Sequence, residues 1–190
     1  MNKTLLIDNF DSFVQNVAHL VRATTDTQIT VCDNRSIPFN DLNLFSHIII
    51  SPGPGVPSES MDLFRLIEMS MHSHKILGIC LGHQTIGEFF GAQLINLNRP
   101  YHGHSSSLVI QDHNDPLFRN IMESQKIIGL YHSWALELNS ISDPLIISSV
   151  NEDNIPMSIR HKSLPIYGIQ FHPESIISKC GKTIISNFYL

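Results

Sequence analysis

Residues 78–82 read Gly78-Ile79-Cys80-Leu81-Gly82, so that one cysteine stands between two glycines. A short apolar run precedes this cysteine, and a segment with helical periodicity follows it. The pattern predicts a nucleophile elbow, a sharp strand-to-helix turn that lifts one reactive side chain out of a sheet. The glycines permit close backbone approach, and the free N–H groups at a helix start favour a thiolate at Cys80. The alternative reading is a small buried cysteine that packs as a hydrophobic side chain.

Strand-like and helix-like segments alternate on both sides of this turn. This alternation predicts an α/β fold with a doubly wound, mostly parallel central sheet flanked by helices. The expected strands of the first half are 3–7, 28–32, 47–51 and 75–79, and the expected helices are 13–23, 61–71 and 81–90.

The second half of the chain is richer in strands, and it predicts a small antiparallel addition with at least one strand returning to the main sheet. The expected strands are 107–111, 126–130, 145–150, 157–161 and 166–171, and a final helix is expected over 181–189. A length of 190 residues suits a single domain over residues 1–190.

Composition excludes several classes of function. The net charge is −5 and no run of lysine or arginine occurs, which argues against nucleic-acid binding. Apolar runs reach only about five residues, too few to span a membrane. The sequence shows no signal-peptide core, and its three cysteines (Cys32, Cys80 and Cys180) are typical of a reducing compartment, so a cytoplasmic protein is expected.

Eleven histidines raise the question of a metal site. The close pairs His72/His74 and His102/His104 are not joined by cysteine or acidic ligands at a familiar zinc spacing. We therefore expect no metal and no other cofactor in this chain.

His172-Pro173-Glu174 follows the last expected strand. Proline restricts the residue before it to extended backbone, and residues two apart in an extended segment point to the same side. Glu174 can therefore orient the imidazole of His172 while its other nitrogen faces a thiol. A polar turn after a strand is the alternative interpretation.

The loop Ser51-Pro52-Gly53-Pro54-Gly55 follows another expected strand. Loops at the carboxyl ends of parallel strands share one edge of the sheet. The backbone N–H groups of Gly53 and Leu81 are therefore candidates for an oxyanion hole beside Cys80. A rigid surface loop is the alternative.

Taken together, the blocks Gly78–Gln84, Ser51–Gly55 and Gly168–Ser175 resemble the signature motifs of the class I glutamine amidotransferases. The blocks Leu6–Phe13 and Tyr131–Ser133 narrow the resemblance to the glutaminase subunits of anthranilate synthase and of aminodeoxychorismate synthase. The resemblance covers nearly the whole chain and implies a flavodoxin-like fold.

The resemblance implies that the Cys80 thiolate attacks the side-chain amide of L-glutamine, giving a glutamyl thioester and ammonia. His172 moves the proton from the thiol to the leaving ammonia, Glu174 orients His172, and water then releases glutamate. The residues implied to hold glutamine are Gly53, Pro54, Gly55, Leu81, Gln84, Ser133 and Trp134.

The sequence departs from the family pattern at Tyr101 and His104, where methionine and lysine are frequent, and at Trp134, where leucine is common. The first two positions are expected near a partner subunit. Trp134 is expected to leave glutamine binding intact, because contacts there are made largely by backbone.

Residues 1–190 leave no room for a second active site that uses ammonia. The resemblance therefore implies a separate synthase subunit that binds chorismate and Mg²⁺. The pattern favours anthranilate synthase and tryptophan biosynthesis over aminodeoxychorismate synthase and folate biosynthesis, although one glutaminase can serve both. A γ-glutamyl hydrolase and a non-catalytic binding module remain as distant alternatives.

Overall fold

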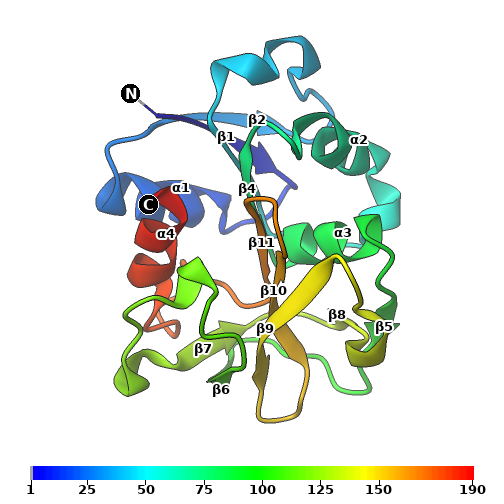
Figure 1. Ribbon diagram of the computed structural model, residues 1–190, viewed down its shortest axis with the longest axis vertical. Coiled ribbons are helices and arrows are strands. Elements are labelled where there is room, and N and C mark those ends of the chain that lie inside the picture. Colours follow the sequence, from blue (N-terminus) through cyan, green and yellow to red (C-terminus); the bar gives the residue numbers. More distant parts are fainter. Residues whose placement is uncertain (1) are drawn as a thin grey trace.

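The computed structural model describes residues 2–190, and its main sheet has nine strands in the order β2-β1-β3-β4-β11-β10-β9-β6-β7 (Figure 1). The first five strands of this order pair in parallel. They are β2 (Gln28–Asp33), β1 (Lys3–Asp8), β3 (His47–Ile50), β4 (Lys75–Ile79) and β11 (Ile166–Ile169). All four residues of β3 are buried, because helices cover both faces of the sheet at this strand.

The remaining strands pair antiparallel and extend the same sheet. They are β10 (Pro156–His161), β9 (Leu145–Asn151), β6 (His104–Ile110) and β7 (Ile127–Leu130). The expected antiparallel addition is confirmed, and β11 is the strand that returns to the parallel part. A separate pair, β5 (Leu94–Asn96) and β8 (Trp134–Leu136), was not predicted, because three residues are too few to display a period.

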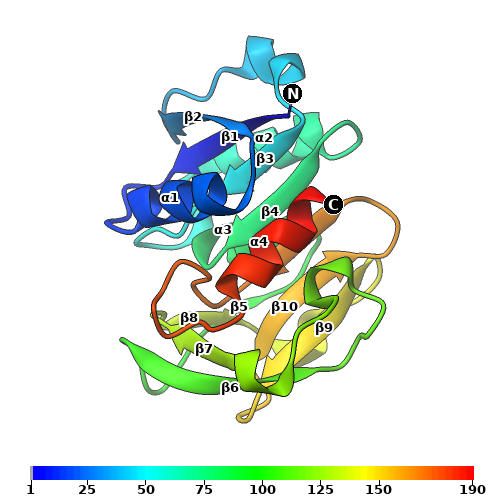
Figure 2. The ribbon, with the colours of Figure 1, turned by 90° about the vertical axis from the view of Figure 1, so that its left-hand side faces the viewer.

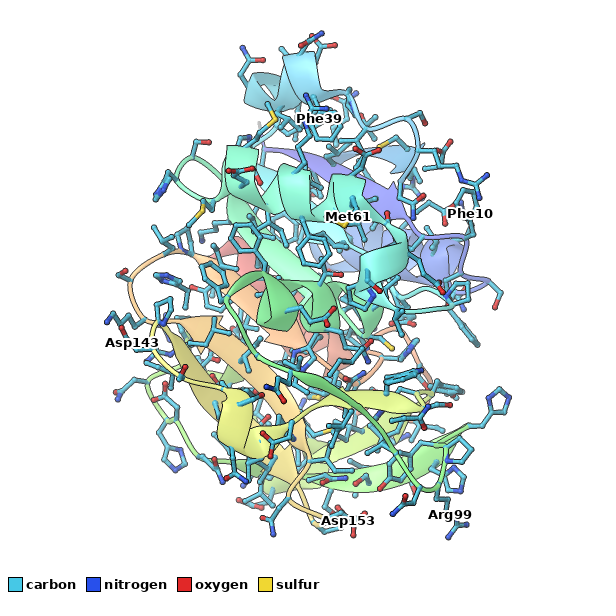
Figure 3. The ribbon with its side chains drawn as sticks, turned by 90° about the vertical axis from the view of Figure 1, so that its right-hand side faces the viewer. Phe10, Phe39, Met61, Arg99, Asp143 and Asp153 are labelled. Carbon is cyan, nitrogen blue, oxygen red and sulfur yellow. The ribbon has the colours of Figure 1, made fainter. Side chains whose placement is uncertain are left out.

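Two helices pack on each face of the sheet. Helices α1 (Val14–Thr24) and α4 (Gly181–Tyr189) lie together on the face turned toward the viewer in Figure 2. Helices α2 (Met61–Ser70) and α3 (Leu81–Phe89) lie on the opposite face, seen in Figure 3. The short 3₁₀ helices are η1 (Phe39–Leu44), η2 (Pro57–Glu59), η3 (Pro116–Phe118), η4 (Glu123–Gln125) and η5 (Leu138–Ser140).

The buried apolar side chains form two clusters, one on each side of the sheet. One includes Val17 of α1 and Ile184 of α4, and the other includes Leu66 of α2 and Ile86 of α3. Within residues 2–190, no helix has the length and apolar character needed to cross a membrane.

Close packing of α3 on the sheet explains the two glycines around Cys80. A Cβ at Gly78 would overlap the backbone carbonyl group of Gly82, and a Cβ at Gly82 would overlap the carbonyl oxygen of Ile50 in β3. These contacts are with backbone, which cannot move aside as a flexible side chain can. The start of α3 can therefore approach β3 and β4 only with hydrogen at both positions.

We predict that Gly78→Ala lowers the free energy of unfolding by roughly 1–3 kcal/mol, the usual cost of inserting a methyl group into a packed interior. Chemical denaturation of both proteins measures this difference. Gly91→Ala is a suitable control: its Cβ would meet no atom within 4 Å, so only the left-handed backbone (φ 92°) adds a penalty. A Gly78→Ala protein as stable as the parent would contradict the packing argument.

Candidate active site

Cys80 occupies the turn between β4 and α3 in a strained conformation. Its φ of 52° and ψ of −100° lie where residues with a Cβ are rarely found. Its N–H donates to the carbonyl oxygen of Ile169 at 2.8 Å, which ties the turn to the end of β11. Cys80 is 6% exposed and precedes the first turn of α3. Strain of this kind persists where the surrounding structure enforces it, and it is concentrated at functional sites.

His172 lies just beyond β11, and its imidazole pairs with Glu174. The Nδ1–H of His172 donates to Oε1 of Glu174 at 2.6 Å, and the two side chains are 3% and 0% exposed. The backbone of His172 is anchored through its N–H to the carbonyl oxygen of Gly129 in β7 at 3.1 Å. Strand β11 was predicted to extend to residue 171, but it ends at Ile169, and the chain bends at Gln170 and Phe171 before it reaches His172.

Opposing effects determine the charge of His172. Burial by itself would lower the pKa of the imidazole, because a cation is poorly accommodated away from water. The Glu174 carboxylate, which accepts from Nδ1, and the nearby Cys80 sulfur outweigh burial and raise the pKa of His172 to about 10. Among the described residues, Nε2 of His172 has no hydrogen-bond partner. The raised pKa favours the imidazolium form of His172 at neutral pH.

Aromatic rings hold the His172 imidazole in place. Phe13 packs edge-on against it with ring centroids 6.0 Å apart, and the centroid of Tyr131 lies at 5.0 Å. The hydroxyl of Tyr131 is hydrogen-bonded to that of Ser175 at 3.0 Å. Phe13 and Tyr131 belong to the blocks Leu6–Phe13 and Tyr131–Ser133, but neither was predicted as a site residue.

A cavity of about 250 Å³ opens beside Cys80, a size suited to a small molecule. It brings together the sequence-predicted residues Gly53, Pro54, Gly55, Cys80, Gln84, Ser133 and Trp134, with Tyr131 and His132 completing the wall. Leu81, His172 and Glu174 do not line it. Residues from three separate segments of the chain thus meet around one sulfur.

Gly53 approaches the start of α3 closely. A Cβ at Gly53 would lie 2.8 Å from Cδ2 of Leu81 and 2.5 Å from Cβ of Asn9. The two expected oxyanion-hole residues, Gly53 and Leu81, are therefore neighbours at the same sheet edge as Cys80.

A second, larger cavity of about 390 Å³ has Pro54 in common with the first. Phe10 and Met61, labelled in Figure 3, are among the residues that line it. Neither Cys80 nor Gln84 does so. We place the reactive site in the smaller cavity, because it alone of the two contains the strained cysteine.

The loop residues around the cavity are held by backbone hydrogen bonds. The N–H of Leu97 donates to the carbonyl oxygen of Ser133 at 2.8 Å, and that of Tyr101 donates to the carbonyl oxygen of His132 at 2.9 Å. Trp134 begins β8 and presents its carbonyl oxygen to Nε2 of Gln84 at 2.8 Å. Segment 97–101 therefore supports the wall of the site.

Two polar residues of the site were missed from the sequence. Gln170 is fully buried between Gln84 and Cys80. His132 donates from Nδ1 to the carbonyl oxygen of Trp134 at 2.9 Å, and burial lowers its pKa to about 4, so it is neutral. A signal for both existed: Gln170 stands in the block Gly168–Ser175 and His132 in the block Tyr131–Ser133.

The substituted loop positions have partners within the chain. The hydroxyl of Tyr101 donates to Oδ2 of Asp153 at 2.7 Å, and its ring centroid lies 5.8 Å from that of His104. Across residues 2–190, no three His, Cys, Asp or Glu side chains are grouped in a way that could hold a metal ion.

Three relatives match nearly the whole chain. A Haemophilus influenzae protein assigned as anthranilate synthase component II is 40% identical, with 98% of this chain and 95% of that protein aligned. Anthranilate synthase component 2 of Saccharolobus solfataricus is 38% identical over 99% of this chain and 98% of its own length. Aminodeoxychorismate synthase of Streptomyces griseus is 31% identical over 98% of this chain, which corresponds to 25% of that larger protein.

A solved structure shows the same fold. A Thermoplasma acidophilum protein assigned as a subunit of GMP synthase superimposes with a TM-score of 0.84, covering 99% of this chain and 92% of its own, at 23% identity. The family model described as glutamine amidotransferase class-I matches residues 5–190. With that match and relatives of up to 40% identity, the chain belongs to the class I glutamine amidotransferases.

Proposed function

We propose that this enzyme hydrolyses L-glutamine with Cys80 as nucleophile, His172 as acid and base, and Glu174 as the group that orients His172. The observation that carries the proposal is the buried pair of His172 and Glu174, 2.6 Å apart, placed near a cysteine in a strained strand-to-helix turn. Membership of the amidotransferase family makes the side-chain amide of glutamine the expected target.

The proposed reaction begins with attack by the sulfur of Cys80. The Cys80 thiolate adds to the amide carbonyl carbon, and the N–H groups of Gly53 and Leu81 receive the developing oxyanion. His172 gives its proton to the leaving nitrogen, so ammonia departs and a glutamyl thioester remains. Neutral His172 then takes a proton from water, the hydroxide adds to the thioester, and glutamate leaves as the thiolate re-forms. These steps use the chain's own groups and water.

We propose that glutamine lies in the cavity of about 250 Å³ with its amide at Cys80. Gly53, Pro54 and Gly55 form one wall, and Ser133 and Trp134 form the other. Gln84 stands one helical turn after Cys80 on the same side of α3. Its amide is suited to the charged α-groups of the substrate.

We further propose that residues 1–190 act as one glutaminase domain that supplies ammonia to a chorismate-binding synthase subunit in the cytoplasm. Anthranilate synthase, and therefore tryptophan biosynthesis, is the favoured partner, because both component II relatives align along most of their own length. Aminodeoxychorismate synthase of folate biosynthesis is the second candidate, since a protein of that name contains a matching segment.

Cys80→Ser should reduce glutamine hydrolysis by at least about a thousandfold, because a serine hydroxyl does not ionise as a thiol does. Ammonia release measures the effect, and a glutamine-analogue diazo-ketone should label Cys80 of the parent protein. Cys32→Ser is the matched control: burial and the Asp33 carboxylate raise the pKa of the Cys32 thiol to about 11, so it stays protonated.

Two outcomes would point to the other functions considered. An inert Cys80 in the parent protein would indicate a non-catalytic binding module. Hydrolysis of γ-glutamyl peptides with full turnover in the absence of any synthase would indicate a γ-glutamyl hydrolase.

Glu174→Gln should move the alkaline limb of the ammonia-release profile to lower pH. The carboxylate helps to raise the pKa of His172, so its loss lowers that pKa, and the proton needed by the leaving nitrogen is lost earlier as pH rises. Losing one charge-assisted hydrogen bond should also cost about 10- to 100-fold in rate near pH 8. Single-turnover ammonia release from pH 6 to 10 is the measurement, and an unmoved limb would contradict this role.

The large subunit of a synthase should raise the glutaminase rate by at least about tenfold, because it completes the oxyanion hole. Glutamate formation is measured with and without the large subunit of anthranilate synthase and, separately, with that of aminodeoxychorismate synthase. The large subunit that co-purifies and its aromatic product identify the pathway. If neither large subunit changes the rate of glutamate formation, the proposed coupling to a synthase is wrong.

A further inference from the structure

We infer that Gln170 donates a hydrogen bond to the reacting sulfur of Cys80, and that a chain of amides starting at the cavity wall fixes the direction of this donor. The inference rests on the proposed role of Cys80 as nucleophile. Gln170 is thereby a second polar partner of the Cys80 sulfur, besides His172, and its amide carries no charge.

The contact is buried and specific. Nε2 of Gln170 lies 3.5 Å from Sγ of Cys80, a hydrogen-bond distance for sulfur, and Gln170 is 0% exposed. Gln170 follows β11 directly, and its own N–H donates to the carbonyl oxygen of Met157 in β10 at 2.8 Å. The backbone that carries His172 to the sulfur therefore carries Gln170 there as well.

The orientation of the Gln170 amide follows from a group that cannot be reversed. The carbonyl oxygen of Trp134 can only accept, so the neighbouring atom of the Gln84 amide, at 2.8 Å, must be Nε2. The same Nε2 lies 3.1 Å from the Gln170 amide and donates its second hydrogen to Oε1. The nitrogen of Gln170 then necessarily faces the sulfur of Cys80.

The reversed orientation would be unfavourable at both ends. Turning the Gln170 amide over would place its oxygen lone pairs against the sulfur and its N–H groups against the N–H groups of Gln84. A buried donor or acceptor left without a partner is costly. The amide chain is thus arranged to stabilise a thiolate more than a neutral thiol.

This donor complements His172 because it keeps its proton. His172 gives up its proton when ammonia leaves, whereas the N–H of Gln170 remains beside the sulfur through both halves of the reaction. It is therefore in place when the thioester breaks and the sulfur again becomes anionic.

The same chain assigns a direction to Gln84. Both hydrogens of its amide nitrogen are used, by Trp134 and by Gln170, so its oxygen is the atom left for a ligand. An acceptor at this position fits the α-ammonium group of an amino acid rather than its carboxylate. The cavity wall and the nucleophile are thereby joined by two side chains.

The test measures the pH dependence of iodoacetamide alkylation at Cys80 in the full chain. Gln170→Met removes the donor at similar size, and we expect the acidic limb of the rate profile to move up by about one pH unit. That shift corresponds to about a tenfold lower rate below the midpoint, the effect of one hydrogen bond to a charged group. The KM for glutamine should change less than the alkylation rate does, because Gln170 does not line the cavity and Trp134 still fixes the direction of the Gln84 amide.

Ser158→Ala is the matched control, because it removes a buried hydrogen bond, to Ser149 at 2.6 Å, in the strand that pairs with β11. Its alkylation profile should match that of the parent protein. A folded Gln170→Met protein with an unmoved limb would overturn the inference. If thermal melting shows that this variant does not fold, Gln170→Glu decides: it keeps the acceptor for Gln84 and places an oxygen at the sulfur, so an unmoved limb there overturns the inference equally.

These outcomes separate the inference from the proposed function. A parent protein whose Cys80 does not react refutes the nucleophile itself. A parent that reacts, with a variant that reacts identically, refutes only the role of Gln170.

Discussion

The pairing of β11 with β4 is the constraint on which the site depends. Four residues of each strand are in register, from Ile166 opposite Ile76 to Ile169 opposite Ile79, and the N–H of Cys80 continues the ladder to Ile169. This pairing brings together two segments about ninety residues apart in the sequence. A slip of one residue would turn every side chain beyond Ile169 to the other face. His172 would then lie away from the sulfur.

The electrostatics of the site follow from this placement. An isolated imidazole with 3% of its side-chain surface exposed would be neutral, as that of the nearby His132 is. His172 differs because two groups that can carry negative charge contact it, one from the next turn of its own segment and one from the start of α3. The fold thus uses burial to suppress charge at one histidine and charged neighbours to retain it at another.

Much of the fold could be predicted from local patterns. The alternation of short apolar runs with helical segments predicted the parallel half of the sheet, because buried strands and amphipathic helices each leave a periodic signal. Strands β5 and β8 left no such signal, since each has three residues and takes its conformation from its partner. The strand β11 was predicted two residues too long, because residues 170 and 171 have the sequence of a strand but bend. The N–H groups of Gln170 and His172 bond to Met157 in β10 and to Gly129 in β7.

The sequence by itself determined the chemistry available to this protein. A cysteine between glycines and a histidine held extended by proline are local patterns, and they predict reactive groups wherever the chain places them. Only the tertiary structure decided which groups surround the sulfur. Gln170 stands in one of the family blocks, but its amide acquires a direction only because Trp134, Gln84 and Cys80 converge on it from other elements. Hydrogen-bond direction in a buried site is set by partners distant in the sequence, and no local pattern records them.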